Sequence, residues 1–135
     1  MRTFLALAAA VGILAASWAA PVASAETTVL PERPNDARVA FVESPSLVDP
    51  HPMTAEGWSR VDGDRAVTVH FTTGTPECFG VHATVVETPA DVTVALVGGT
   101  LPDAVGRACI MIAVSGTISV PLQSPLGDRV VLADS

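Results

Sequence analysis

Apolar and polar residues alternate with a period of two along several short stretches of the chain. The alternation is clearest in RAVTVHF (65–71), FGVHATVVE (79–87) and DVTVALV (91–97), where valines fall on one side and threonines and histidines on the other. Prolines, glycines and aspartates separate these stretches. Such a pattern is typical of half-buried β-strands joined by turns. We therefore predict an all-β fold, a small antiparallel β-sandwich that is immunoglobulin-like in general architecture.

Further strands are predicted on both sides of this region. ARVAFVES (37–44), TISVPL (117–122) and RVVLA (129–133) alternate in the same way, and ACIMIAV (108–114) is almost continuously apolar, which indicates a strand covered on both faces. The apolar phase changes at residues 115–117, where a hairpin or a bulge in one bent strand would explain it, and the bulge is preferred. In residues 44–64, prolines at positions 45, 50 and 52 favour a loop over a regular strand. We expect Trp58 to hold this loop in place by packing against a sheet.

Two turns suggest how the strands pair. ETPAD (87–91) is suited to a short hairpin in which Glu87 pairs with Val92, and this register brings the apolar faces of both strands to one side. The connection TTGTPECF (72–79) allows a second hairpin with Phe71 opposite Val81. The two registers agree on which face forms the core.

The second register also places His70 directly opposite His82, on the outer face. A cross-strand pair of imidazoles can bind Zn²⁺ or Cu²⁺ when a third ligand is near. The alternative is two half-exposed histidines without a ligand. Because no third ligand can be named, His70 and His82 are only weak metal candidates, and we predict no metal and no cofactor.

The N-terminal 25 residues have the features of a secretory signal peptide. Arg2 precedes an apolar run, and Ala23-Ser24-Ala25 matches the small-x-small pattern for cleavage between Ala25 and Glu26. An uncleaved membrane anchor is the competing interpretation. We expect residues 26–36 to be a flexible lead-in and residues 37–135 to form a single β-sandwich domain.

The charge of the chain narrows the choice of partners. After residue 25, six arginines stand against 14 carboxylates, and lysine is absent. Nucleic acid is a poor partner for this surface, because phosphate binding needs clustered positive charge. No basic amphipathic helix is present to lie on an anionic membrane, and no membrane span is expected after signal cleavage.

Cys78 and Cys109 are the only cysteines. In an exported chain, two thiols of a small domain most often form one disulfide. The predicted hairpin returns the chain to the end where Cys78 lies, and a short connection then leads to Cys109. No Cys-x-x-Cys pair or helix start indicates a reactive thiol.

The familiar catalytic motifs are missing. The chain has no Gly-x-Ser-x-Gly elbow and no phosphate-binding glycine loop. Asp62 and Asp64 have the spacing of calcium ligands, but no further ligands follow them, so a plain turn is favoured. We therefore predict no catalytic residues.

Several short segments of the sequence resemble those of a known group of proteins. They are Pro76-Glu77-Cys78, Gly80-Val81-His82-Ala83, Ala108-Cys109, Met111-Ile112-Ala113-Val114 and Pro121-Leu122 with Pro125-Leu126-Gly127-Asp128-Arg129. Over residues 43–132 the chain resembles small exported actinobacterial proteins, chiefly mycobacterial, that have no assigned activity. The resemblance implies export and paired cysteines, and it implies no catalytic residue or ligand.

These observations together predict a secreted or cell-envelope module that is not an enzyme and that serves in binding or structure. Its partner would be an extracellular or envelope protein or ligand. The alternative is a metal-binding or hydrolytic extracellular protein that uses the face with His70 and His82.

Overall fold

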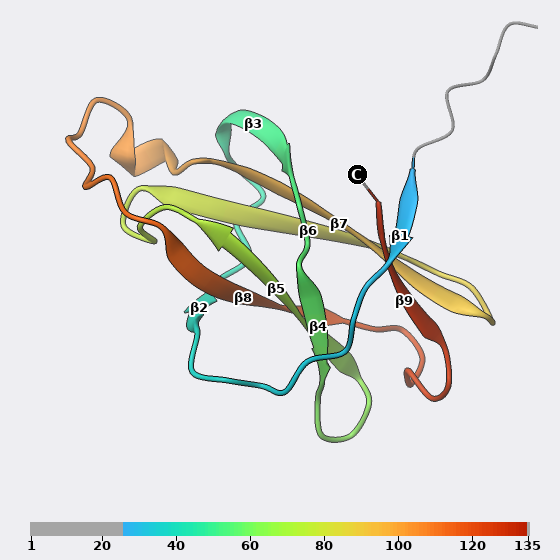
Figure 1. The fold of residues 1–135 in the computed structure, drawn as a ribbon. Helices are drawn as coiled ribbons and strands as arrows, with labels where there is room; N and C mark the ends of the chain where they lie inside the picture. Colours follow the sequence, from blue (N-terminus) through green and yellow to red (C-terminus); the bar gives the residue numbers. More distant parts are fainter. Residues whose placement is uncertain (1–25, 135) are drawn as a thin grey trace, which may run out of the picture.

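The computed structural model describes residues 26–134, and the predicted signal peptide and its cleavage site at Ala25 lie outside or at the border of this range. Two β-sheets pack face to face, as Figure 1 shows. The described elements are β1 (Thr27–Val29), β2 (Val39–Phe41), β3 (Val48–Met53), β4 (Gly57–Arg60), β5 (Ala66–Thr73), β6 (Phe79–Glu87), β7 (Asp91–Thr100), the short 3₁₀ helix η1 (Pro102–Ala104), β8 (Val114–Pro121) and β9 (Val130–Asp134). The predicted all-β sandwich of immunoglobulin-like general architecture is confirmed.

The first sheet is organised around β7. Strand β6 pairs antiparallel with residues 92–100 of β7 and occupies one edge of that strand. The other edge of β7 is shared: β9 pairs with residues 91–95 and β3 with residues 96–100. Strand β1 extends the sheet beyond β9. The predicted hairpin register is confirmed, because Glu87 pairs with Val92 and Val85 with Val94.

The second sheet has the order β2-β8-β5-β4. The prediction that β5 pairs with β6 is wrong: the connection between them crosses from one sheet to the other, and Phe71 pairs with Gly116 of β8 instead of Val81. The sandwich is also not wholly antiparallel, because β2 runs parallel to β8 and β9 parallel to β7. The alternation indicated the correct buried faces but could not indicate which strands are neighbours.

The core lies between the two sheets and is made of the alternating apolar residues. Its buried members in the long strands come from both sheets and include Val67, Val69, Phe71, Val81, Val92, Val94, Leu96, Ile118, Val120 and Val131. Phe41 and Phe71 meet edge to face at 5.3 Å. A Cβ atom on Gly116 would lie 2.7 Å from both rings, so only glycine allows β8 to approach them this closely.

Residues 26–36, expected to be a flexible lead-in, are tied to the domain. Strand β1 pairs with β9, and Leu30 is buried in the core. Farther on, the backbone of Arg33 donates to the carbonyl of Trp58 at 2.7 Å, and the Trp58 amide donates to Pro31. We call residues 30–38 the strap, because they run from the first sheet across the edge of the second. Backbone pairing forms here without any hydrophobic period, which explains why the pattern did not predict it.

The proline-rich region is also more regular than expected. Strands β3 and β4 lie within it, although β3 contains Pro50 and Pro52. Strand β3 lies at the edge of its sheet, where prolines are tolerated, and its register shifts between Val48 and His51, where Asp49 adopts a φ of 52°. The predicted burial of Trp58 is confirmed, and the residue lies within β4.

The prediction of a covered strand over ACIMIAV is wrong. Strand β8 begins only at Val114, and its pairing with β5 is regular from there to Pro121, so neither a hairpin nor a bulge is present at residues 115–117. The change of apolar phase marks the start of the strand. The preceding residues, 110–113, form an exposed segment that we call the apolar loop.

Candidate functional site

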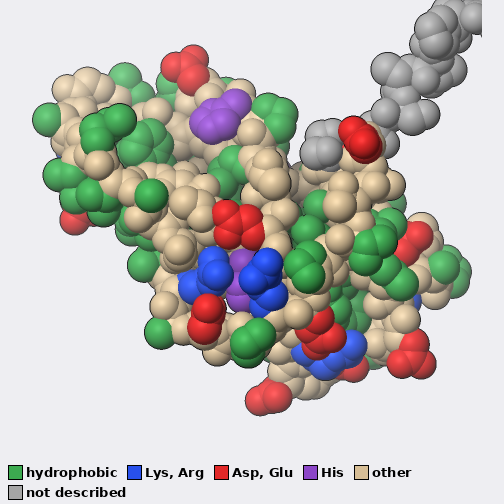
Figure 2. Space-filling view, viewed as in Figure 1, with side chains coloured by type: hydrophobic (Ala, Val, Ile, Leu, Met, Phe, Trp, Pro, Cys, Tyr) green, Lys and Arg blue, Asp and Glu red, His purple; other side chains and the backbone are tan. Residues whose placement is uncertain are grey.

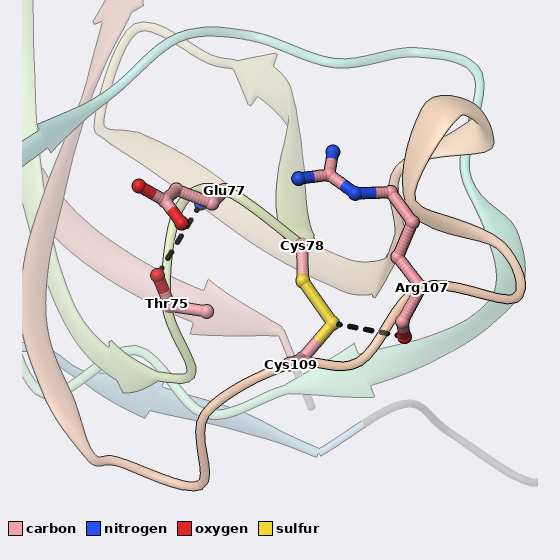
Figure 3. The surroundings of a disulfide bond; sticks show 5 residues. All are labelled: Thr75, Glu77, Cys78, Arg107 and Cys109. Atoms are coloured by element: carbon pink, nitrogen blue, oxygen red, sulfur yellow. Dashed lines mark hydrogen bonds between the residues drawn. A yellow bond between two sulfur atoms is a disulfide. The ribbon is translucent and has the colours of Figure 1, made fainter.

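The disulfide between Cys78 and Cys109, predicted from the sequence, is present and fixes one end of the sandwich (Figure 3). Cys78 precedes β6 and is buried, and its carbonyl accepts a hydrogen bond of 2.8 Å from the amide of Leu101. Cys109 lies on the long connection between β7 and β8. The bond therefore holds this connection, and with it the apolar loop, against the start of β6.

Large aliphatic side chains of the apolar loop are exposed. Met111 is 94% exposed, Ile110 is 62% exposed and Ile112 is 49% exposed. They line a groove of about 510 Å³ together with Phe79 and Thr72, which come from the ends of β6 and β5. His51 of β3 forms part of the same wall. A contiguous exposed patch of this kind is typical of an interaction site, whereas single exposed apolar residues are not.

Exposed acidic residues lie at the same end of the sandwich as the disulfide. They are Asp49 in β3, Glu77 directly before Cys78 and Asp103 in η1, and Arg107 is the one arginine on the described chain between Arg65 and Arg129. On the face that Figure 2 shows, hydrophobic side chains gather at the end with the long connections, a histidine and acidic side chains lie near them, and no arginine lies among them. This end thus carries the apolar loop together with exposed acidic residues.

His70 and His82 are not brought together. Strand β5 belongs to the second sheet and β6 to the first, so the predicted cross-strand pair and its common face do not exist. Within residues 26–134, no three histidine, cysteine, aspartate or glutamate side chains lie close enough to hold a metal ion. The cross-strand pair on which the metal alternative rested is therefore not formed.

His82 has a carboxylate partner that the sequence did not suggest. Its Nδ1 contacts Oε1 of Glu43, and Oε2 of the same carboxylate accepts a hydrogen bond of 3.1 Å from the amide of Ala83. The backbone of Glu43 and Ser44 also bridges to Val81, and so fixes the segment after β2 against the edge of β6. The pair therefore connects the two sheets. His82 faces outward, as predicted, but its side chain is only partly exposed.

His70 is completely buried, contrary to the expectation of an outer, half-exposed residue. Its side chain points away from the core, but the strap covers it. Nε2 lies 2.6 Å from the hydroxyl oxygen of Ser59, and that hydroxyl donates to the carbonyl of Arg33 at 2.8 Å. Nδ1 has no hydrogen-bond partner among the described residues.

The serine and histidine do not form a hydrolytic site. Ser59 is 1% exposed, so a substrate has no access to its hydroxyl group. No carboxylate of the part of the chain that the structure describes bonds Nδ1 of His70, as the orienting acid of a catalytic triad would. Burial lowers the pKa of His70, and the positive charge of Arg38 lowers it further. The pair is a buried structural contact.

Comparison of the chain with protein-family models, with curated proteins and with solved structures gives no match. The resemblance to exported actinobacterial proteins therefore remains a prediction from the sequence. Within residues 26–134, no helix is long and apolar enough to cross a membrane.

Proposed function

We propose that this protein is a secreted or cell-envelope binding module without enzymatic activity, and that it binds a protein partner through the apolar loop and the adjoining groove. The observation that carries the proposal is the exposure of Ile110, Met111 and Ile112 side by side next to a disulfide. Leaving large aliphatic side chains in water costs about 25 cal/mol for each Å² of apolar surface, and a partner that covers them recovers this free energy.

The disulfide supports the same proposal. A loop that is already held in one conformation loses less conformational entropy on binding than a free loop does. Cys109 lies directly before Ile110, so the cross-link restrains the apolar loop at its first residue, and β8 restrains it after Ala113. Both ends of the binding segment are therefore fixed before a partner arrives.

Exposed acidic residues at the disulfide end indicate the chemistry of that partner. Asp49 lines a depression with Cys109 and Arg107, Glu77 directly precedes Cys78, and Asp103 lies in η1. A second copy of this chain or an anionic lipid surface would bring like charges together. We infer a protein with an apolar patch flanked by lysine or arginine, because complementary charge speeds association and selects against other partners.

A co-purification experiment tests the proposal. The disulfide-bonded protein is immobilised and exposed to envelope extract of the producing organism, in parallel with the triple variant Ile110→Ser, Met111→Ser and Ile112→Ser. The matched control is the double variant Val29→Ser and Val86→Ser, which removes side chains of similar exposure, 64% and 65%, from the first sheet.

We expect the unchanged protein and the control to retain one common protein, and the triple variant to lose it without a change in melting temperature. Weaker retention at high salt would agree with a basic partner. Equal retention by all three proteins, or retention of no protein that the triple variant loses, would contradict the proposal.

A further inference from the structure

The strap closes the sandwich at two places. Its first residue, Leu30, is buried and donates from its amide to the carbonyl of Val131 in the first sheet, at 3.0 Å. Pro31 and Arg33 then pair with the amide and the carbonyl of Trp58, at the outer edge of β4 in the second sheet. Other contacts of the strap are polar: Glu32 lies 3.7 Å from Arg60, and the carbonyl of Arg33 accepts a hydrogen bond from Ser59, the residue that contacts His70.

The hydrogen bonds define which ring nitrogen of His70 donates. The single proton of the Ser59 hydroxyl is donated to the carbonyl of Arg33, so the 2.6 Å contact with Nε2 requires the histidine to donate. Nδ1 is then the nitrogen that carries no proton when the ring is neutral. It is buried and has no hydrogen-bond partner among residues 26–134. Neutral His70 is thus part of the closed arrangement.

Charged groups surround this ring, chiefly from the strap. Arg33, Asp36 and Arg38 belong to the strap, and Glu56 precedes β4. The neighbouring strand β8 contributes the uncharged Thr117. Arg38 binds Asp36 at 2.8 Å and lies 3.7 Å from Glu56. In Figure 2, arginine side chains flank a histidine on both sides and acidic side chains lie next to them.

Protonation of His70 would oppose this arrangement in two ways. The new proton on Nδ1 would be a buried donor without an acceptor among the described residues, which is unfavourable, more so for a charged group than for a neutral one. Burial itself disfavours the positive charge, and Arg38 and Arg33 disfavour it further, whereas Asp36 and Glu56 act in the opposite direction. Both effects are relieved when the strap leaves and His70 becomes exposed to water.

We propose that His70 is an acid-sensitive latch, whose protonation releases residues 30–38 from β4 while the rest of the sandwich stays folded. The release uncovers the backbone amide and carbonyl of Trp58, which then form a free strand edge. A free edge of this kind can pair with a strand of another chain. The proposal concerns the strap alone and does not depend on the apolar loop.

The sign and size of the effect follow from linkage. Burial and Arg38 lower the pKa of His70 in the closed form, whereas in the open form it returns toward the ordinary value. The closed strap is therefore fully favoured above about pH 6.5 and loses stability as the pH falls below it. The opening equilibrium can rise by up to about 30-fold between about pH 7.5 and about pH 5.

Hydrogen exchange measured by mass spectrometry tests the latch. Protection of the amides of residues 30–38 and of Trp58 is compared at the two pH values, after correction for the intrinsic exchange rate. We expect protection there to fall in acid, by up to about 30-fold, while β6 and β7 keep theirs. The variant His70→Gln, which keeps a donor for Ser59 but cannot be protonated, should show no such fall. The control His82→Gln should behave like the unchanged protein.

Unchanged protection of the strap in acid, or an equal fall in His70→Gln, would overturn the proposal. If His70→Gln does not fold, NMR titration of the unchanged protein decides. We expect the ring of His70 to be the Nε2–H form at neutral pH, and the strap amides to shift with the same midpoint as the ring. Protonation of His70 that leaves the strap amides unchanged would equally overturn the latch.

Discussion

Several polar side chains of this protein hold together segments that are distant in sequence. Glu87 accepts hydrogen bonds from the amides of Gln123 and Ser124 and binds Arg129 at 3.1 Å. The guanidinium group of Arg129 also donates to the carbonyls of Thr88, Ser124, Pro125 and Leu126. This cluster closes the end of the sandwich opposite the disulfide, and none of it was predicted, since such partners leave no periodic pattern.

Replacement of Glu87 by Gln should lower the melting temperature at neutral pH and have little effect in strong acid. The amides of Gln123 and Ser124 and the charge of Arg129 lower the pKa of Glu87. Its contribution is therefore present above the ordinary pKa of about 4.3 and is lost as the pH falls through the lower value of the folded state. Thermal unfolding at neutral and acid pH measures this, with Glu77→Gln as the control. An equal effect at both pH values would contradict it.

Neighbouring residues of β8 test the assignment of faces. Val120 is 3% exposed and faces the core, whereas Ser119 is exposed on the opposite face. We expect Val120→Asp to destabilise the fold by at least about 3 kcal/mol, because it buries an unpaired charge, and Ser119→Asp to change stability by less than about 0.5 kcal/mol. Urea denaturation measures both. Similar values for the two variants would show that the faces are wrongly assigned.

At the scale of elements, strand periodicity predicted strands but not all of their partners. The hairpin of β6 and β7 was predictable because Pro89 lies in a short turn, and a turn of this length allows the two strands to pair in only one register. The pairing of β5 was not, because a connection of similar length can join two strands of one sheet or cross to the other sheet. The alternation of apolar residues is the same in both cases.

The apolar loop shows the converse problem. A continuous apolar run indicates a buried strand only when other segments of the same chain cover it. No other described segment buries residues 110–113, so the apolar pattern alone predicted the wrong structure. Likewise, Ser59 and Glu43 had no sequence signal, because each obtains its role from a partner more than ten residues away.

The disulfide should stabilise the fold and also order the apolar loop. Cys78 and Cys109 are 31 residues apart, and closing such a loop contributes about 3.5 kcal/mol in the chain-entropy model. We expect Cys78→Ser and Cys109→Ser to lower the free energy of unfolding by similar amounts, and both to lower the protection of residues 108–113 from hydrogen exchange. Free thiols in the unreduced protein, or no loss of stability, would contradict this.

At the scale of the whole molecule, the two ends of the sandwich differ. One end is closed by Glu87 and Arg129, and the other carries the disulfide, the groove and the apolar loop. The strap joins both sheets along one side. Because Glu87, Arg129 and the strap stabilise the rest of the fold, the disulfide end can expose apolar side chains that are not part of the core.

The central claim is that the apolar loop is a binding surface, and site-specific photo-crosslinking tests it most directly. A photoreactive residue is placed at Met111 in one protein and at Val86 in another, and each is irradiated in envelope extract. We predict one dominant crosslinked protein for position 111, absent at position 86 and lost when an excess of unlabelled protein is added. Crosslinking at position 111 that is no stronger or more specific than at position 86 would contradict the claim.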